Sequence, residues 1–261
     1  MVTGLAGRRA LVTAASKGLG FASARALAAE GCRVAIASSS GPRIQQAALE
    51  LRTDGADVIG RAADLASASD CQDLVAWAIS ELGGLDVLVN NTRGPILGKV
   101  GELSDSAWSD AFELVLMSAV RLSRLALPEL LKSGHGVIVN LTSIAARQPI
   151  DNLVLSNALR PAVIAVGKTL SNEAAPAVRV NSIFTGRFAT DRIIEENRHQ
   201  ARDRGIDEAE MAARSIQNIP LRRLGRPEEL ADAVVFLAGD CSSFITGATL
   251  GVDGGEYTGL Y

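Results

Sequence analysis

The segment Thr13-Ala-Ala-Ser-Lys-Gly-Leu-Gly20 follows an apolar run that starts at Arg9 and precedes an Ala-rich stretch that continues to Glu30. Glycines at positions 18 and 20 let the backbone approach a pyrophosphate closely, and the unpaired N–H groups at the start of a helix favour its negative charge. A glycine pair between a strand and a helix therefore predicts a nucleotide-binding unit at the beginning of a doubly wound fold.

Short apolar runs and longer helical stretches alternate along the rest of the chain. Strands are expected at 9–13, 33–38, 58–59, 87–90, 137–141, 178–183 and 249–252, and helices at 18–30, 42–52, 68–82, 104–132, 153–174 and 227–238. Runs that are apolar throughout are typical of parallel strands covered on both faces. The pattern predicts an α/β fold: a doubly wound, mainly parallel, Rossmann-like sheet with helices on both faces.

One segment interrupts this alternation. Residues 187–218 are rich in charge and prone to form helices, as in Asp191-Arg-Ile-Ile-Glu-Glu196. No repeat, low-complexity tract or linker divides the chain, so we expect residues 1–261 to form a single dinucleotide-binding domain. Within it, about 187–218 is expected to be a helical lid over a ligand at the carboxyl edge of the sheet. The other interpretation is a pair of solvated surface helices.

The composition restricts the class of protein. The chain has 261 residues, 48% hydrophobic and 21% charged, with a net charge of -3, which is typical of a soluble globular protein. The slightly negative net charge predicts no nucleic-acid partner. No apolar run reaches the length of about 20 residues that a membrane span needs, which predicts no membrane span. Residues 1–9 lack the apolar stretch of a signal peptide, which predicts a cytoplasmic location. Three scattered cysteines predict neither a disulfide framework nor a metal site.

Several motifs, in this order and spacing, resemble those of the short-chain dehydrogenase/reductase family, and of 3-oxoacyl-ACP reductases within it. The opening segment resembles TGxxxGxG, with Ala14 in place of the first glycine. Asn90-Asn91 resembles the NNAG turn, and Val139-Asn-Leu-Thr-Ser143 resembles the strand that carries the active-site serine. Downstream, 179–190 resembles RVN…PGxxxT, and 252–255 matches the closing VDGG motif.

The resemblance implies a dinucleotide site spread over the carboxyl ends of several strands. Asp64 fits the acid that contacts adenine, and Thr190 fits the residue that holds the nicotinamide carboxamide. The cofactor-binding residues are predicted to be Thr13, Ala15, Ser16, Lys17, Gly18, Leu19, Gly20, Ser38, Ser39, Asp64, Leu65, Asn91, Arg160, Gly186 and Thr190.

The choice of cofactor depends on the charge after the second strand. An NAD-binding site places a carboxylate there to accept the ribose hydroxyls, whereas a 2′-phosphate favours cations and hydroxyl donors. This chain has Ser38-Ser-Ser40-Gly41 at that place, and Lys17 matches the basic residue of NADP-preferring relatives. Arg43 lies on the next predicted helix and is a further candidate. We therefore expect NADP(H) in preference to NAD(H).

The catalytic positions depart from the resembled family, whose reductases use Asn, Ser, Tyr and Lys. Ser143 fits the serine, but Val115, Ser156 and Arg160 stand at the other three positions. Both tyrosines, Tyr257 and Tyr261, lie at the end of the chain.

Ser156 and Arg160 lie four residues apart, on one face of the predicted helix. Serine is a much weaker acid than tyrosine, and arginine keeps its proton. We therefore predict Ser143, Ser156 and Arg160 as catalytic residues that stabilise an alkoxide electrostatically. Water, Asp151 or Tyr257 would supply the proton.

Three functions stay open from the sequence. The first is an NADP(H)-dependent oxidoreductase that reduces a carbonyl, or oxidises an alcohol, of a small or acyl-type substrate. The second is a non-redox enzyme on the same scaffold, such as a dehydratase, an isomerase or a cyclase. The third is a nucleotide-binding regulatory protein. A polar pair at the replaced positions favours chemistry, and the resemblance implies a homo-oligomer, either a tetramer or a dimer.

Overall fold

The computed structural model of the protein describes residues 2–53 and 55–260. Among these residues, seven strands form one parallel sheet in the order β3-β2-β1-β4-β5-β6-β7. The sheet contains β1 (Arg9–Val12), β2 (Arg33–Ser38), β3 (Val58–Ala62), β4 (Val87–Asn90), β5 (Gly136–Leu141), β6 (Val178–Thr185) and β7 (Thr249–Val252). The predicted doubly wound parallel sheet is confirmed, and β1 and β4 lie next to each other at its centre.

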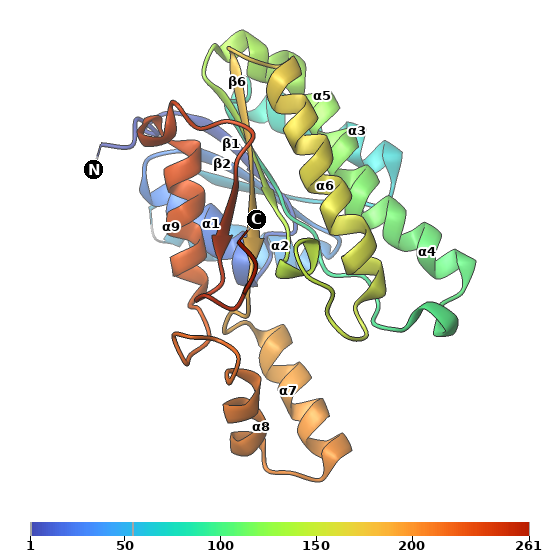
Figure 1. Cartoon of the computed structure of the whole chain (residues 1–261). Coiled ribbons are helices and arrows are strands. Elements are labelled where there is room, and N and C mark those ends of the chain that lie inside the picture. Colours follow the sequence, from blue (N-terminus) through green and yellow to red (C-terminus); the bar gives the residue numbers. More distant parts are fainter. Residues whose placement is uncertain (1, 54, 261) are drawn as a thin grey trace.

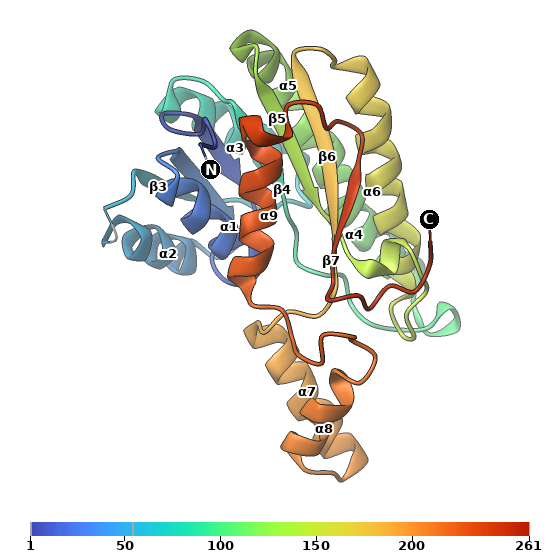
Figure 2. The ribbon, with the colours of Figure 1, turned by 60° about the vertical axis from the view of Figure 1, so that its left-hand side comes forward.

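Helices cover both faces of the sheet (Figures 1 and 2). One layer consists of α1 (Gly18–Ala29), α2 (Gly41–Thr53) and α9 (Pro227–Ala238). The other consists of α3 (Ala68–Leu82), α5 (Ser118–Ser133) and α6 (Val154–Glu173). Each layer buries its own core, with Ile36 on one face and Ile138 on the other, because a central parallel strand is covered on both sides. None of the described helices is both long and apolar enough to cross a membrane.

The helical stretch expected over 104–132 is continuous but not regular. It consists of α4 (Asp105–Ala111), the π-helical segment η2 (Phe112–Met117) and α5. The hydroxyl of Ser104 accepts a hydrogen bond from the backbone N–H of Ala107 and caps α4. Val115, at the position expected for the family's asparagine, lies in the π-helical segment and is buried. The described residues also form three short helices: η1 (Val100–Glu102), η3 (Ile144–Ala146) and η4 (Asp240–Ser242).

The charged segment after β6 forms two helices, α7 (Asp191–Arg204) and α8 (Glu208–Ser215). They extend beyond the carboxyl edge of the sheet, away from the two helical layers (Figures 1 and 2). Asn197 is buried between them and donates a hydrogen bond to the hydroxyl of Ser215, at 3.3 Å. Met211 is buried as well, so the pair has a small core of its own.

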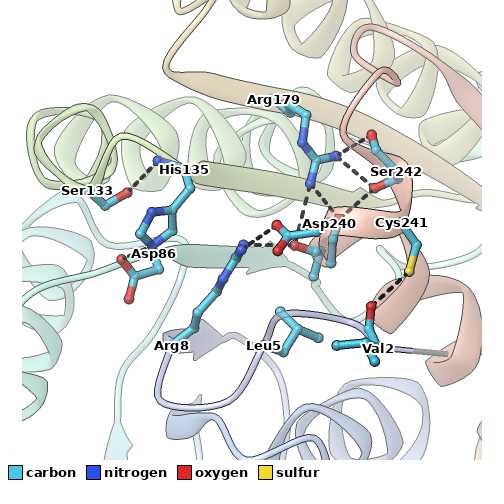
Figure 3. A network of polar contacts seen from close by, with 12 residues as sticks. Val2, Leu5, Arg8, Asp86, Ser133, His135, Arg179, Asp240, Cys241 and Ser242 are labelled. Atoms are coloured by element: carbon cyan, nitrogen blue, oxygen red, sulfur yellow. Dashed lines mark hydrogen bonds and ion pairs between the residues drawn. The ribbon is translucent and has the colours of Figure 1, made fainter.

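Charged residues form hydrogen bonds and ion pairs at the amino edge of the sheet (Figure 3). Arg179 donates to the carbonyl oxygens of Leu237 and Gly239, both at 3.0 Å, and to that of Ser242 at 3.1 Å, which satisfies carbonyls at the end of α9. Arg8 forms an ion pair with Asp240 at 2.5 Å.

Asp86 is the centre of a second group at this edge. Its carboxylate accepts hydrogen bonds from the backbone and the side chain of Arg9, at 2.7 to 2.8 Å. His135 lies 3.3 Å away through Nε2 (Figure 3). Burial acts to raise the pKa of Asp86, but the hydrogen bonds from Arg9 outweigh it and hold that pKa below its usual value. Asp86 is therefore ionised and fully partnered.

Candidate active site

A cleft of about 1090 Å³ opens at the carboxyl edge of the sheet and extends beneath α7. Most of the residues predicted for the cofactor and for catalysis line this single cleft. They are Ser16, Lys17, Gly18, Leu19, Ser38, Ser39, Asp64, Leu65, Asn91, Ser143, Ser156, Arg160, Gly186 and Thr190. Thr13, Ala15 and Gly20 are buried and are not among the lining residues.

The glycine segment is tied to the end of β4 by the residues that lie behind the cleft. Thr13 Oγ1 donates to the carbonyl oxygen of Asn91 at 2.8 Å and accepts from its N–H at 2.9 Å. A Cβ built at Gly20 would lie 2.5 Å from the carbonyl oxygen of Ala14 and 2.8 Å from Asn91 Nδ2. Only glycine fits there, so the loop is held close to the sheet in the form that a pyrophosphate requires.

The position of the missing first glycine keeps the backbone of a glycine. Ala14 has φ of 47°, in the left-handed region that L-residues seldom adopt. The loop therefore has, at position 14, a backbone conformation that favours glycine, although the residue is alanine.

Cations and hydroxyls surround the end of the cleft that follows β2. Ser38, Ser39 and Arg43 line it, and Lys17 approaches from the glycine segment. In this structure Lys17 Nζ lies 3.6 Å from Asp191 at the start of α7, and both side chains are exposed. Such a pair is weak, so Lys17 is available to an anionic ligand.

The other end of the cleft holds the residues predicted for catalysis. Ser143 Oγ accepts a hydrogen bond from the N–H of Ala145 at 3.2 Å, which leaves its own proton free to be donated into the cleft. Ser156 lies on α6 and is 6% exposed, and no other described residue forms a hydrogen bond with its side chain. The hydroxyl groups of Ser143 and Ser156 are therefore two donors that line the same cleft.

Arg160 follows one turn later on α6 and is only 8% exposed. Its Nη1 donates to the carbonyl oxygen of Leu141 at 3.0 Å, while its Nε is buried without an acceptor. Burial, and after it the charge of Arg192, lowers the pKa of Arg160 to about 10, so the side chain remains cationic at neutral pH. Arg160 supplies a fixed positive charge and does not relay a proton.

Several residues of the cleft were not predicted as site residues from the sequence. Thr92 has a buried hydroxyl without a partner, as expected of a group that a ligand contacts. Arg192 and Glu256 line the cleft from α7 and from the C-terminal segment, and burial raises the pKa of Glu256. The charge of the 187–218 segment was visible in the sequence, but nothing distinguished Arg192 within it.

The two candidate proton donors differ in position. Asp151 lines the cleft. Tyr257 instead packs edge-on against Phe184, with the ring centroids 5.6 Å apart, and is not among the lining residues. Tyr261 lies outside the described residues. The geometry thus favours Asp151 over Tyr257.

The comparisons with known proteins agree with the fold. A family model described as enoyl-(acyl carrier protein) reductase matches residues 13–257. Dehydrogenase/reductase SDR family member 4 of Oryctolagus cuniculus is 34% identical over 253 residues, which cover 96% of this chain and 94% of that protein.

Two solved structures are similar over nearly the whole chain. L-sorbose reductase from Gluconobacter frateurii, complexed with NADPH and L-sorbose, has a TM-score of 0.96 at 32% identity, with both chains covered completely. A variant of actinorhodin polyketide ketoreductase with NADPH has a TM-score of 0.91 at 30% identity, covering 97% of this chain and 98% of that one.

Proposed function

The chain belongs to the short-chain dehydrogenase/reductase family, and from that premise we propose that it is an NADP(H)-dependent oxidoreductase with an atypical active site. It reduces a carbonyl, or oxidises the corresponding alcohol, of a small or acyl-type substrate. One observation carries the proposal: a buried cationic Arg160 shares a cleft with two serine hydroxyls and with the glycine segment. Hydride transfer to a carbonyl places negative charge on oxygen, which such a group stabilises.

The preference for NADP(H) over NAD(H) rests on the end of the cleft that follows β2. Lys17 and Arg43 supply cations there, and Ser38 and Ser39 supply hydroxyls. A ribose 2′-phosphate favours such donors, whereas NAD-binding sites have an acid in that region. The two similar reductases described above carry NADPH, which supports the same choice.

The chemistry divides between the cofactor and the residues of the chain. Bound NADPH supplies a hydride to the carbonyl carbon. Ser143 donates a hydrogen bond to the carbonyl oxygen, and Arg160 stabilises the negative charge that develops there. Ser156 adds a second donor. The oxygen then takes a proton from water, either directly or relayed through Asp151, since neither serine nor arginine is an effective acid at neutral pH.

We also propose that α7 and α8 act as a lid. Residues of α7 line the cleft along much of the helix, among them Ile193, Glu196 and Gln200. Closure of such a helical pair excludes water from the reacting groups and strengthens the electrostatic effect of Arg160.

We further propose that the protein forms a homo-oligomer, since β7 is an edge strand and Leu250 on it is partly exposed. Sedimentation of the protein tests this point, because a mass equal to the 27.2 kDa of one chain would contradict an oligomer.

The first experiment is a fluorescence titration with NADPH and, separately, with NADH. We expect tighter binding of NADPH, and Lys17→Ala should reduce the preference by about tenfold because it removes a charge-assisted contact. Lys132→Ala is the matched control, because Lys132 is an exposed lysine on α5 that pairs with Glu129. Binding of neither nucleotide would contradict the proposal.

The stoichiometry then separates the redox enzyme from its alternatives. Equal consumption of NADPH and formation of alcohol supports the reductase. Conversion of a substrate without net consumption of NADPH indicates a dehydratase, an isomerase or a cyclase. A nucleotide-binding regulatory protein gives no turnover with any carbonyl compound tested.

A further inference from the structure

Two arginines line the catalytic half of the cleft, one of them buried and the other exposed. Arg160 comes from α6 and Arg192 from the first turn of α7, and the charge of Arg192 acts on Arg160. A Cβ built at Gly94 would collide with the guanidinium of Arg192, so this side chain extends across to the loop that follows β4. Glycine at position 94 is what permits the close approach.

Within the described part of the chain, no carboxylate forms an ion pair with either arginine. Among residues 2–53 and 55–260, no ion pair involves Arg160 or Arg192, and none involves Arg93, which lines the cleft beside Gly94. The acids nearest to Arg192 along α7 are Asp191, Glu195 and Glu196, and none of them forms an ion pair with it among the described residues. Asp191 pairs with Lys17 at 3.6 Å, and Glu196 lies 3.9 Å from Arg187.

Two like charges without a counterion are unfavourable, most of all where one of them is nine-tenths buried. Arg160 uses one donor on Leu141 and has a second, Nε, without an acceptor. Planar guanidinium groups bind carboxylates through paired charge-assisted hydrogen bonds. The arrangement therefore has the charge and the unused donors of an anion site.

We propose that Arg160 and Arg192 form a subsite for a carboxylate of the substrate, so that the enzyme acts on an oxo acid or the corresponding hydroxy acid. The inference rests on the proposed function and specifies its substrate class. The carboxylate lies near the carbonyl that Ser143 contacts, because Ser143, Ser156 and Arg160 line one end of the cleft. Since Arg192 belongs to α7, a carboxylate that bridges the two arginines also links α7 to α6.

The nucleotide carries phosphates of its own, which are the other source of negative charge in this cleft. The start of α7 lies close to the glycine segment, since a Cβ built at Gly18 would lie 3.5 Å from Thr190. Arg192, however, lies against Gly94 and acts on Arg160. This position favours the substrate over the pyrophosphate, and the experiment separates the two.

The test uses matched probes in which a methyl group caps the carboxylate and removes its charge: 2-oxobutanoate with its methyl ester, and 3-oxobutanoate with its methyl ester. Each is titrated by calorimetry into the full-length protein saturated with NADP⁺, and in parallel into the cofactor-free protein. At least one acid should bind about tenfold more tightly than its ester. Arg192→Gln should remove that preference while the dissociation constant of NADPH and the melting temperature stay unchanged.

Arg198→Gln is the matched control, because Arg198 lies on the same helix, pairs with Glu208 and does not line the cleft. It should leave the preference intact. The inference is overturned if neither acid is preferred or bound, or if the preference survives in Arg192→Gln. A loss of NADPH affinity in Arg192→Gln with the acid preference retained assigns the pair to the pyrophosphate instead. Failure of the nucleotide to bind wild-type protein would contradict the proposed function, whereas nucleotide binding without an acid preference contradicts only this inference.

Discussion

At the amino edge of the sheet Arg179 donates to several carbonyl oxygens at the end of α9, and Arg8 pairs with Asp240 (Figure 3). At the carboxyl edge Arg160 is more deeply buried, yet it donates to a single carbonyl and shares its cleft with a second arginine, Arg192. The first arrangement satisfies the charges within the chain. The second leaves a charge and a donor unused.

The difference teaches how to separate a structural arginine from a functional one. A guanidinium whose donors are taken up by the fold contributes stability, because buried polar groups are favourable only when they are paired. A buried guanidinium without compensation costs stability, so its presence in a cleft indicates a ligand that completes it. Substitution of Arg179 should therefore change the stability of the fold, whereas substitution of Arg160 should change the activity.

The largest effect is expected for Arg160→Leu. Removing the fixed charge should lower kcat/KM for carbonyl reduction by about 10² to 10³, as for other groups that stabilise an oxyanion. The free energy of unfolding should stay the same or rise, since an apolar side chain replaces an unpaired buried charge. Steady-state kinetics and urea unfolding measure the two effects. A strongly destabilised variant with normal kinetics would reverse the assignment of the two edges.

Arg179→Leu should show the opposite pattern. Its loss leaves carbonyls at the end of α9 without donors, and we expect the free energy of unfolding to fall by about 2 to 3 kcal/mol. NADPH affinity of the folded protein should not change, because Arg179 does not line the cleft. Urea unfolding and a fluorescence titration check this, and a specific loss of turnover in a protein of normal stability would contradict it.

Ser143→Ala should lower kcat by about tenfold, since one hydrogen bond to the carbonyl oxygen is lost. The matched control lies at the amino edge: Ser133 donates to the carbonyl oxygen of Leu130 and should be replaceable by alanine without a change in kcat. Parallel assays with NADPH and one carbonyl substrate make the comparison. Equal rates in wild type and Ser143→Ala would remove Ser143 from the site.

The smallest effect concerns pH at the amino edge. The pKa of Asp86 is lower in the folded chain than in the unfolded one, so its contribution to stability is present above the unfolded value of about 3.9 and is lost as the pH falls through the folded value. Urea midpoints measured from pH 6 downwards should fall less steeply in Asp86→Asn than in wild type. Parallel slopes would show that Asp86 is not the group that titrates.

The sequence predicted the sheet and its covering helices well, because runs such as 34–37 are apolar throughout and only a doubly covered parallel strand needs that. It missed the π-helical turn at 112–117, since an extra residue in a helical turn leaves the hydrophobic spacing almost unchanged. Ala14 shows a similar limit. The backbone of a glycine persists there although the residue does not suggest it.

The residues of the candidate site that belong to sequence motifs were predictable. Those that reach the cleft only through the packing of distant segments were not. The residues of the glycine segment and Ser143 follow from local patterns, and most of them line the cleft. Thr13 and Gly20 belong to the same pattern but support the loop from behind. Arg192 and Glu256 come from segments far apart in the chain, and only the folded chain brings both of them to the cleft.

The adjacency of β1 and β4 at the centre of the sheet also bears on how such a protein can evolve. The glycine segment and the serines that follow β2 come from the first half of the chain, while Ser143, Ser156 and Arg160 come from the second. Mutations that alter the reacting groups therefore leave most of the coenzyme contacts untouched. A lineage with this arrangement can exchange its reacting groups while it keeps its glycine segment.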